Sequence, residues 1–234
     1  MSITPFLGKW YHRSPYFIRR PVFKFIKWLD APGRYFRTRA DTSIPRVRLQ
    51  QQHIQNCQIV LDRRTMLSRL PAGGITAELG VDEGAFSEII LTEVKPETLH
   101  LVDVWDMGRY NDAKYQAVTE KFRGNIESGG IKIVRQYSTD AAAGFPDGHF
   151  QLVYIDTDHS YETTAEELKL WGPKISEHGI IAGHDYKMGN WKSANRYGVI
   201  EAVHEFCVNA GWELVYLTAD PTESQSFAIR KIAR

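Results

Sequence analysis

The sequence has few cysteines, no long apolar run and almost no net charge. Only Cys57 and Cys207 occur among 234 residues, far apart and outside any C-x-x-C spacing, which argues against a disulfide framework and a thiolate zinc site. The longest apolar stretch near the start, residues 21–29, is interrupted by Lys24 and Lys27. It therefore resembles neither a signal-peptide core nor a membrane span. These features predict a protein of the reducing cytoplasm.

The formal net charge of +1 hides an asymmetry along the chain. Residues 1–48 hold eleven Lys and Arg against two Asp, which leaves +9, whereas residues 49–234 carry −8. A basic segment on an acidic body suggests an anionic partner, such as a membrane surface, a phosphorylated substrate, nucleic acid or a second subunit. We therefore predict a basic aromatic N-terminal arm over 1–48 and a catalytic domain over 49–234.

The arm interleaves its basic residues with ten aromatic ones. Its prolines, at positions 5, 15, 21, 32 and 45, predict only short helices. A piece such as Val22 to Leu29 could lie on a lipid surface, which would make the protein peripheral to a membrane. Packing over a partner subunit is the favoured interpretation, and it predicts a homo-oligomer. Nucleic acid is not an expected partner.

The rest of the chain alternates apolar runs with helical stretches. A helix is predicted over Gln50 to Leu70, ending at Pro71. Beyond it, strands are predicted at 75–79, 99–104, 131–134, 150–155, 179–182, 212–217 and 226–230, and helices near 85–92, 113–128, 163–174 and 199–210. This alternation predicts an α/β fold with a doubly wound, mainly parallel seven-stranded sheet. The last two strands lack a crossover helix between them, so the last should be antiparallel.

The first strand of this series runs into a glycine loop, E-x-G-x-x-x-G, from Glu78 to Gly84. About 25 residues later the second strand ends in Asp103, where a carboxylate can accept hydrogen bonds from ribose hydroxyls. A dinucleotide site would need to hold a pyrophosphate, but the loop carries three carboxylates, Glu78, Asp82 and Glu83. Their charge suits the ammonium and sulfonium groups of S-adenosylmethionine. The alternative is an ordinary strand-to-helix turn.

Polar residues also follow the fourth and fifth strands of the series. The fourth ends in Y-I-D-T-D-H-S-Y-E, which contains Asp156, Asp158 and His159, and the fifth in G-H-D-Y, which contains His184 and Asp185. Carboxyl ends of adjacent strands converge, so Asp156, His184 and Asp185 could hold a divalent metal. The alternative is that Asp156 and Asp158 only cap the following helix.

The glycine loop and Asp103 resemble the cofactor motifs of class I S-adenosylmethionine-dependent methyltransferases. The resemblance implies a Rossmann-like methyltransferase fold in which Glu78, Gly80, Gly84 and Asp103 bind the cofactor. It also implies that Trp105 lines the adenine. The base would be contacted by Ser138, at the start of Ser138-Thr139-Asp140, and Asp156 is assigned to both cofactor and metal.

The strand ends at Asp156 and His184 look like those of macrocin-type sugar O-methyltransferases and enzymes related to cephalosporin hydroxylase, over roughly residues 75–186. In metal-dependent relatives, which include catechol and aminocoumarin O-methyltransferases, the positions matching Asp156, His184 and Asp185 hold magnesium. His184 replaces a carboxylate of those relatives, which leaves the divalent metal open between magnesium and another ion. The resemblance makes Asp158 the general base, with His159 as the alternative.

The sequence thus predicts an O-methyltransferase that uses S-adenosylmethionine, with a metal, on a small-molecule or sugar hydroxyl. Trp191, Lys192 and Arg196 lie in a loop after the fifth strand and suggest a sugar or anionic acceptor. Two alternatives stay open: a metal-dependent hydroxylase-like enzyme on the same fold, and a non-enzymatic adaptor that binds through the basic arm.

Overall fold

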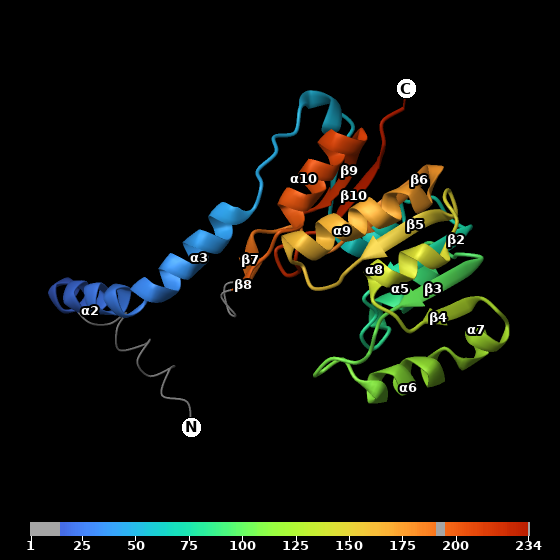
Figure 1. Ribbon diagram of the computed structural model, residues 1–234, viewed down its shortest axis with the longest axis horizontal. Helices are drawn as coiled ribbons and strands as arrows, with labels where there is room; N and C mark the ends of the chain where they lie inside the picture. The colour runs from blue at the N-terminus through green and yellow to red at the C-terminus, as the bar shows by residue number, and fades with distance from the viewer. Residues whose placement is uncertain (1–14, 191–194, 234) are drawn as a thin grey trace. The chain divides into compact units, whose positions relative to one another are not determined.

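The computed structural model describes residues 15–190 and 195–233. The chain divides into two units, Met1–Ile44 and Pro45–Arg234, whereas the sequence predicted a boundary after residue 48. Within the described residues, the first unit consists of helices α2 (Tyr16–Leu29) and α3 (Ala31–Ser43) (Figure 1). None of the helices in the described ranges has the length and apolar character needed to cross a membrane.

The second unit is built on an eight-stranded sheet with the order β1-β9-β10-β6-β5-β2-β3-β4 (Figure 1). The strands are β1 (Gln58–Val60), β2 (Ile75–Leu79), β3 (Thr98–Val102), β4 (Ile131–Val134), β5 (Phe150–Ile155), β6 (Ile175–Gly183), β9 (Trp212–Thr218) and β10 (Phe227–Lys231). Strand β10 is antiparallel to β6 and β9, and the other pairings are parallel. The predicted α/β class and the antiparallel last strand are confirmed, and each of the seven predicted strands is present, but β1 makes the sheet eight-stranded.

The predicted helix over residues 50–70 is wrong. This segment forms a short 3₁₀ turn, η1 (Gln51–His53), then the edge strand β1 and a short helix, α4 (Arg63–Leu67). Strand β1 pairs in parallel with β9, and the Asp62 carboxylate begins α4 by accepting a hydrogen bond from the Thr65 N–H at 2.6 Å. A strand partner more than 150 residues away thus overrides the local helical pattern.

The arm also differs from its prediction, because its helices are not short. Helix α2 runs for 14 residues with Pro21 inside it, and α3 runs for 13 with Pro32 in its first turn. Proline is tolerated in the first turn because the N–H there has no intrahelical partner. Pro21 removes one donor from α2, and this single loss does not end the helix.

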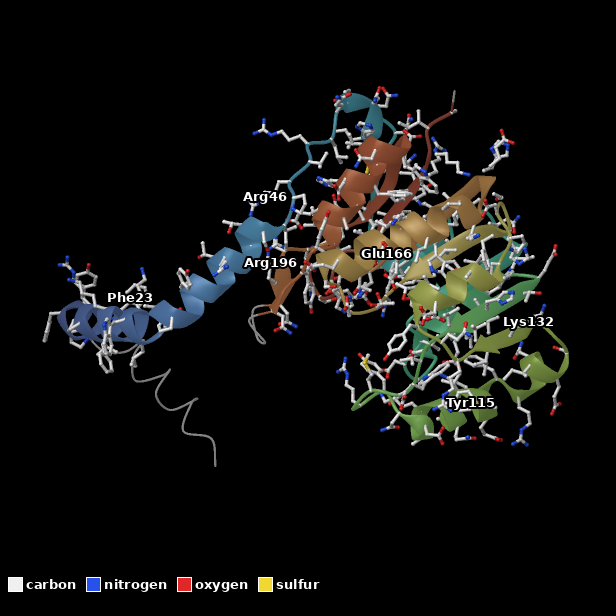
Figure 2. The ribbon with its side chains drawn as sticks, viewed as in Figure 1. Phe23, Arg46, Tyr115, Lys132, Glu166 and Arg196 are labelled. Atoms are coloured by element: carbon white, nitrogen blue, oxygen red, sulfur yellow. The ribbon has the colours of Figure 1, made fainter. Side chains whose placement is uncertain are left out.

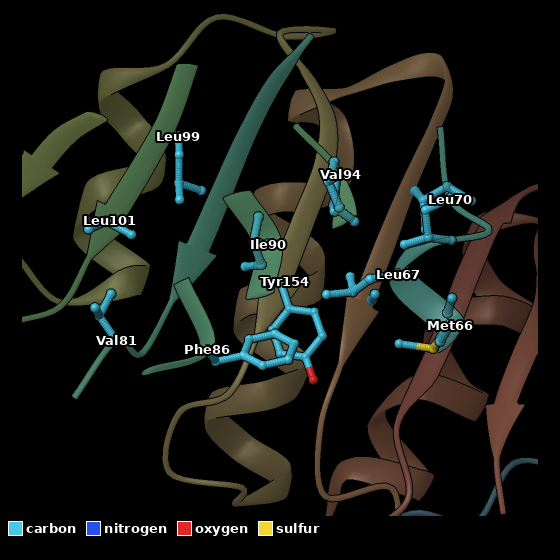
Figure 3. Packing of buried hydrophobic residues seen from close by; sticks show 14 of the residues in the cluster. Met66, Leu67, Leu70, Val81, Phe86, Ile90, Val94, Leu99, Leu101 and Tyr154 are labelled. Carbon is cyan, nitrogen blue, oxygen red and sulfur yellow. The ribbon is translucent and has the colours of Figure 1, made fainter. Parts of the chain in front are cut away.

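Helices cover both faces of the sheet, and each face has its own apolar core. Helices α4, α5 (Ala85–Glu93), α6 (Asp112–Lys121) and α7 (Arg123–Glu127) lie on one face; α8 (Ser138–Ala141), α9 (Tyr161–Trp171) and α10 (Val199–Ala210) lie on the other. In the first core the Phe86 ring of α5 packs on Tyr154 of β5 with 4.3 Å between ring centroids (Figure 3). The predicted helix at 113–128 is divided at Phe122 into α6 and α7.

The sheet register brings four loops to one edge. Leu79 pairs with both Val102 and Ile155, and Ile155 pairs with Gly183. The residues that follow these strand ends are therefore neighbours in space, although more than 100 positions separate the first from the last. In an open parallel sheet this edge is the usual place for a ligand.

Candidate active site

Gly80 lies in the tightest part of the glycine loop. Its φ is +85°, and a Cβ at this position would stand 2.1 Å from the backbone oxygen of Asp156. Its N–H donates a hydrogen bond to the Val102 carbonyl at 2.9 Å. Only glycine allows the chain to pass between β3 and β5 in this way. Gly84, at φ +69°, precedes α5 and packs against Phe122.

We expect Gly80→Ala to lower the free energy of unfolding by about 3 kcal/mol or more, because it adds a backbone clash to an unfavourable φ. Gly129→Ala is the matched control, because Gly129 has φ +80° and open space around its Cβ position. It should cost about 1 kcal/mol, the penalty of the left-handed conformation alone. Urea denaturation of both variants measures the difference. Equal losses would show that the close approach to Asp156 costs nothing.

Asp103 organises the glycine loop from the end of β3. Its Oδ2 accepts hydrogen bonds from the N–H groups of Val81 at 2.9 Å and Asp82 at 3.1 Å, and its Oδ1 accepts one from the Trp105 N–H at 3.1 Å. The carboxylate is half-buried, so it still faces solvent. It is therefore placed both to shape the loop and to accept hydrogen bonds from a ligand.

Trp105 does not occupy the predicted position beside a ligand. Its side chain has 0% exposed surface and packs on Tyr115 of α6. The indole N–H donates to the Asp82 carbonyl at 2.9 Å. Trp105 adopts φ +44°, and its ring lies in the core. The residue therefore supports the glycine loop through its bond to Asp82 and cannot line an adenine in this conformation.

Glu78 is also buried beneath the loop. Its Oε2 accepts a hydrogen bond from the Ser87 hydroxyl of α5 at 2.5 Å. Burial raises the pKa of Glu78 from 4.5 to about 8, the Ser87 hydrogen bond opposes this shift, and the charges of Asp156 and Asp103 add to it. At physiological pH the Glu78 carboxyl is therefore mostly protonated and uncharged. It lies close enough to Asp103 and Asp156 for their charges to affect its pKa.

The Glu78 pKa predicts a pH-dependent stability. Because the folded pKa lies above the unfolded value, the stabilising effect of the bound proton is complete below about pH 4.5 and is lost as the pH rises through about 8. We expect the wild type to lose about 3 kcal/mol of unfolding free energy between pH 5 and pH 8 relative to Glu78→Gln. Denaturant titrations of the two proteins at both pH values test this. Parallel curves would contradict it.

Asp156, His184 and Asp185 come together at the ends of β5 and β6. The His184 Nδ1 lies 3.6 Å from Oδ2 of Asp156 and 3.5 Å from Oδ2 of Asp185. Burial alone would lower the pKa of His184, but hydrogen bonds and charges from both aspartates outweigh it and raise the pKa to about 9. Burial would raise the pKa of Asp185, yet bonds from His184 and Ser224 hold it well below its usual range.

His159 joins this cluster, and Asp158 does not. The His159 Nε2 lies 3.2 Å from Oδ2 of Asp185. By contrast, Asp158 is exposed, and its two oxygens accept hydrogen bonds from the Ser160 N–H at 2.8 Å and the Thr163 hydroxyl at 2.9 Å. These bonds fix the turn into α9, whose N-cap is Ser160. The helix-capping interpretation therefore fits Asp158, although not Asp156.

The cluster has the donors of a metal site. One ligand atom from each of Asp156, His184 and Asp185 can be chosen so that all three lie within 4.8 Å of one another. The His184 Nε2 is buried without a hydrogen-bond partner, so Nδ1 is the nitrogen turned toward the carboxylates. Two carboxylates and an imidazole fit a divalent transition metal better than magnesium. Such an ion would replace the proton that the two carboxylates hold on His184.

The sequence analysis missed two polar residues that tie the site together. Glu167 of α9 is fully buried and accepts hydrogen bonds from the predicted Ser138 and from Thr157, at 3.0 Å for the latter. Burial raises the pKa of Glu167 to about 7. Its position on the apolar stripe of α9, three residues after Thr164 and four before Trp171, was the available signal. Lys187 was also missed, and its ammonium lies 3.0 Å from Oδ1 of Asp185.

The structure describes Arg196 in the loop that was expected to contact an acceptor. Trp191 and Lys192 lie outside the described residues. Arg196 forms an ion pair with Glu201 of α10 and donates to the Met188 carbonyl at 3.1 Å. Arg196 thus holds the hairpin of β7 (Gly189–Asn190) and β8 (Asn195–Arg196) against α10. Its predicted role in acceptor binding stays a prediction.

Two of the cavities among the described residues border strands of the sheet. A small one is lined by His159 and His184 together with Ile155 and Phe227, so it belongs to the site. A larger one, of about 540 Å³, is lined among others by His178 near the start of β6. Its lining contains none of the predicted site residues, and we place the active site at the small cavity because the polar cluster is there.

Residues 77–186 match the family model of a methyltransferase domain. Over this stretch the chain is similar to methyltransferase domains. The match spans the glycine loop, Asp103 and the cluster that ends at Asp185. The match indicates an S-adenosylmethionine-dependent methyltransferase, and the order of the strands agrees with it. A search among curated protein sequences found no match.

Solved structures resemble this methyltransferase in fold. A putative rRNA methylase from Clostridium thermocellum aligns over 74% of this chain and 94% of its own, with a TM-score of 0.55 at 14% identity. An O-methyltransferase family protein from Burkholderia thailandensis aligns over 73% and 55%, with a TM-score of 0.55 at 11% identity. A SAM-dependent methyltransferase from Leishmania major aligns over 72% and 70%, with a TM-score of 0.53 at 10% identity.

Proposed function

We propose that this enzyme transfers the methyl group of S-adenosylmethionine to a hydroxyl oxygen of a small molecule. The observation that carries the proposal is the contact between His159 and Asp185 at the carboxyl ends of β5 and β6. Asp185 is anionic and fixes the imidazole through Nε2, which leaves Nδ1 to accept a proton. No charged nucleophile is needed from the protein, because the acceptor oxygen itself attacks the methyl carbon.

The proposed reaction is a direct displacement. The acceptor O–H gives its proton to His159, the oxygen forms a bond to the methyl carbon, and the carbon–sulfur bond breaks with its electrons returning to sulfur. The sulfonium becomes a neutral thioether. Close placement of oxygen and methyl group supplies much of the rate. A divalent metal held by Asp156, His184 and Asp185 would lower the pKa of the acceptor hydroxyl.

Sugars are the first acceptor class to test, because the strand-end motifs resemble those of sugar O-methyltransferases. The enzyme would be incubated with methyl-labelled cofactor and a panel of sugars, phenols and, separately, bulk RNA, with and without Mn²⁺. Label in an alkali-stable ether, dependent on His159, supports the proposal. Label in RNA, or on nitrogen or carbon only, would refute oxygen transfer to a small molecule.

A further inference from the structure

Helix α2 presents an apolar side that is strongly aromatic. Phe17, Pro21, Phe25 and Trp28 recur at intervals of three or four residues, so they lie along one side of the helix. Phe17 is 73% exposed, Phe25 59% and Trp28 69%. Phe25 and Trp28 stack with 6.1 Å between their ring centroids, which makes a continuous aromatic surface. Rings this exposed favour an apolar partner.

The side of α2 next to these rings is cationic. Arg20, Lys24 and Lys27 recur at the same helical spacing, and the chain holds no Asp or Glu before Asp30. The Lys27 ammonium lies 4.6 Å from the centroid of the Phe23 ring, so the cation stays beside an aromatic group (Figure 2 shows Phe23 on this helix). An aromatic side flanked by cations is the feature of a helix that lies in a membrane interface.

We propose that α2 binds the surface of an anionic lipid bilayer, with its aromatic side among the acyl chains and its cations among the headgroups. A second copy of the chain is the competing occupant. The composition favours lipid, because protein interfaces are depleted in lysine whereas interfacial helices are enriched in it. The cationic side also finds no neutralising acid on its own helix, and anionic headgroups supply that charge.

Sedimentation of the 234-residue chain with lipid vesicles tests the proposal. Vesicles of phosphatidylcholine, with and without phosphatidylglycerol, would be compared at low and high salt. We expect strong binding only with phosphatidylglycerol, weakened by salt. Lys24→Glu with Lys27→Glu should reduce partitioning roughly 25-fold or more, since each cation near the surface contributes about fivefold. Phe25→Ser with Trp28→Ser should reduce it by at least about tenfold.

Matched controls lie on the enzyme body. Lys169→Glu changes an exposed lysine of α9, and Ile59→Ser removes an exposed apolar side chain of β1; neither should alter partitioning. Cofactor binding by every variant verifies that the body is folded. Absent vesicle binding, equal binding to both vesicle types, or binding unaffected by the α2 variants would overturn the proposal. A fall in molar mass by light scattering in these variants without vesicle binding would instead identify a second copy as the occupant.

Discussion

Asp103→Ala is expected to weaken S-adenosylmethionine binding about 100-fold or more. The substitution removes the carboxylate that we propose accepts hydrogen bonds from the ribose, and the N–H groups of Val81, Asp82 and Trp105 lose their common acceptor. Hydrogen bonds to a charged group contribute roughly 1.5–3 kcal/mol each. Losing the bonds to the ligand together with those that order the loop should therefore weaken the affinity more than about 100-fold. Calorimetric titration of the purified enzyme measures the change.

Two further variants sharpen this test. Asp103→Asn keeps an oxygen that can accept a backbone hydrogen bond, so its affinity should lie between those of the wild type and Asp103→Ala. Asp147→Ala removes an exposed aspartate paired with Lys174 and should bind the cofactor normally. Unchanged affinity in Asp103→Ala would mean that the glycine loop is not the cofactor site.

Asp185→Asn should reduce kcat at least about 100-fold while cofactor affinity stays close to that of the wild type. Asp185 contacts His159, His184 and Lys187 at once, so the substitution removes the charge that orients all three. Single-turnover methyl transfer, measured with an acceptor found in the panel, separates this step from cofactor binding. Loss of cofactor affinity without loss of rate would assign Asp185 to binding instead.

The same assay separates the two candidate bases. His159→Ala should match the loss in Asp185→Asn, whereas Asp158→Ala should lose less than about tenfold, because both Asp158 oxygens serve the turn into α9. A larger loss in Asp158→Ala than in His159→Ala would identify Asp158 as the base and give His159 a structural role.

The sequence could predict the positions where strand ends converge, but not the direction of individual side chains. Asp156 and Asp185 were predicted to meet because parallel strands bring their carboxyl ends to one edge. Asp158 and His159 are adjacent in sequence, and the left-handed φ of +65° at His159 decides which one faces Asp185. A single backbone angle of this kind leaves no trace in residue spacing.

Burial explains the other differences. Trp105 follows Asp103 closely enough to suggest a ligand contact. In the structure its ring packs in the core against Tyr115 instead. Strand β1 was hidden because three residues carry too little pattern to outweigh a helical neighbourhood. Its pairing with β9 depends on a segment that only the folded chain brings near.

The unpredicted strand β1 covers part of an edge that could otherwise pair with another chain. It covers Tyr216 to Thr218 of β9, a seven-residue strand that would otherwise present free N–H and C=O groups along the rim. A shortened chain that begins after residue 62 should therefore self-associate through β9, and light scattering would detect this, whereas one that begins at Pro45 should stay dispersed. A truncated protein for crystallisation should therefore begin before β1, not after it.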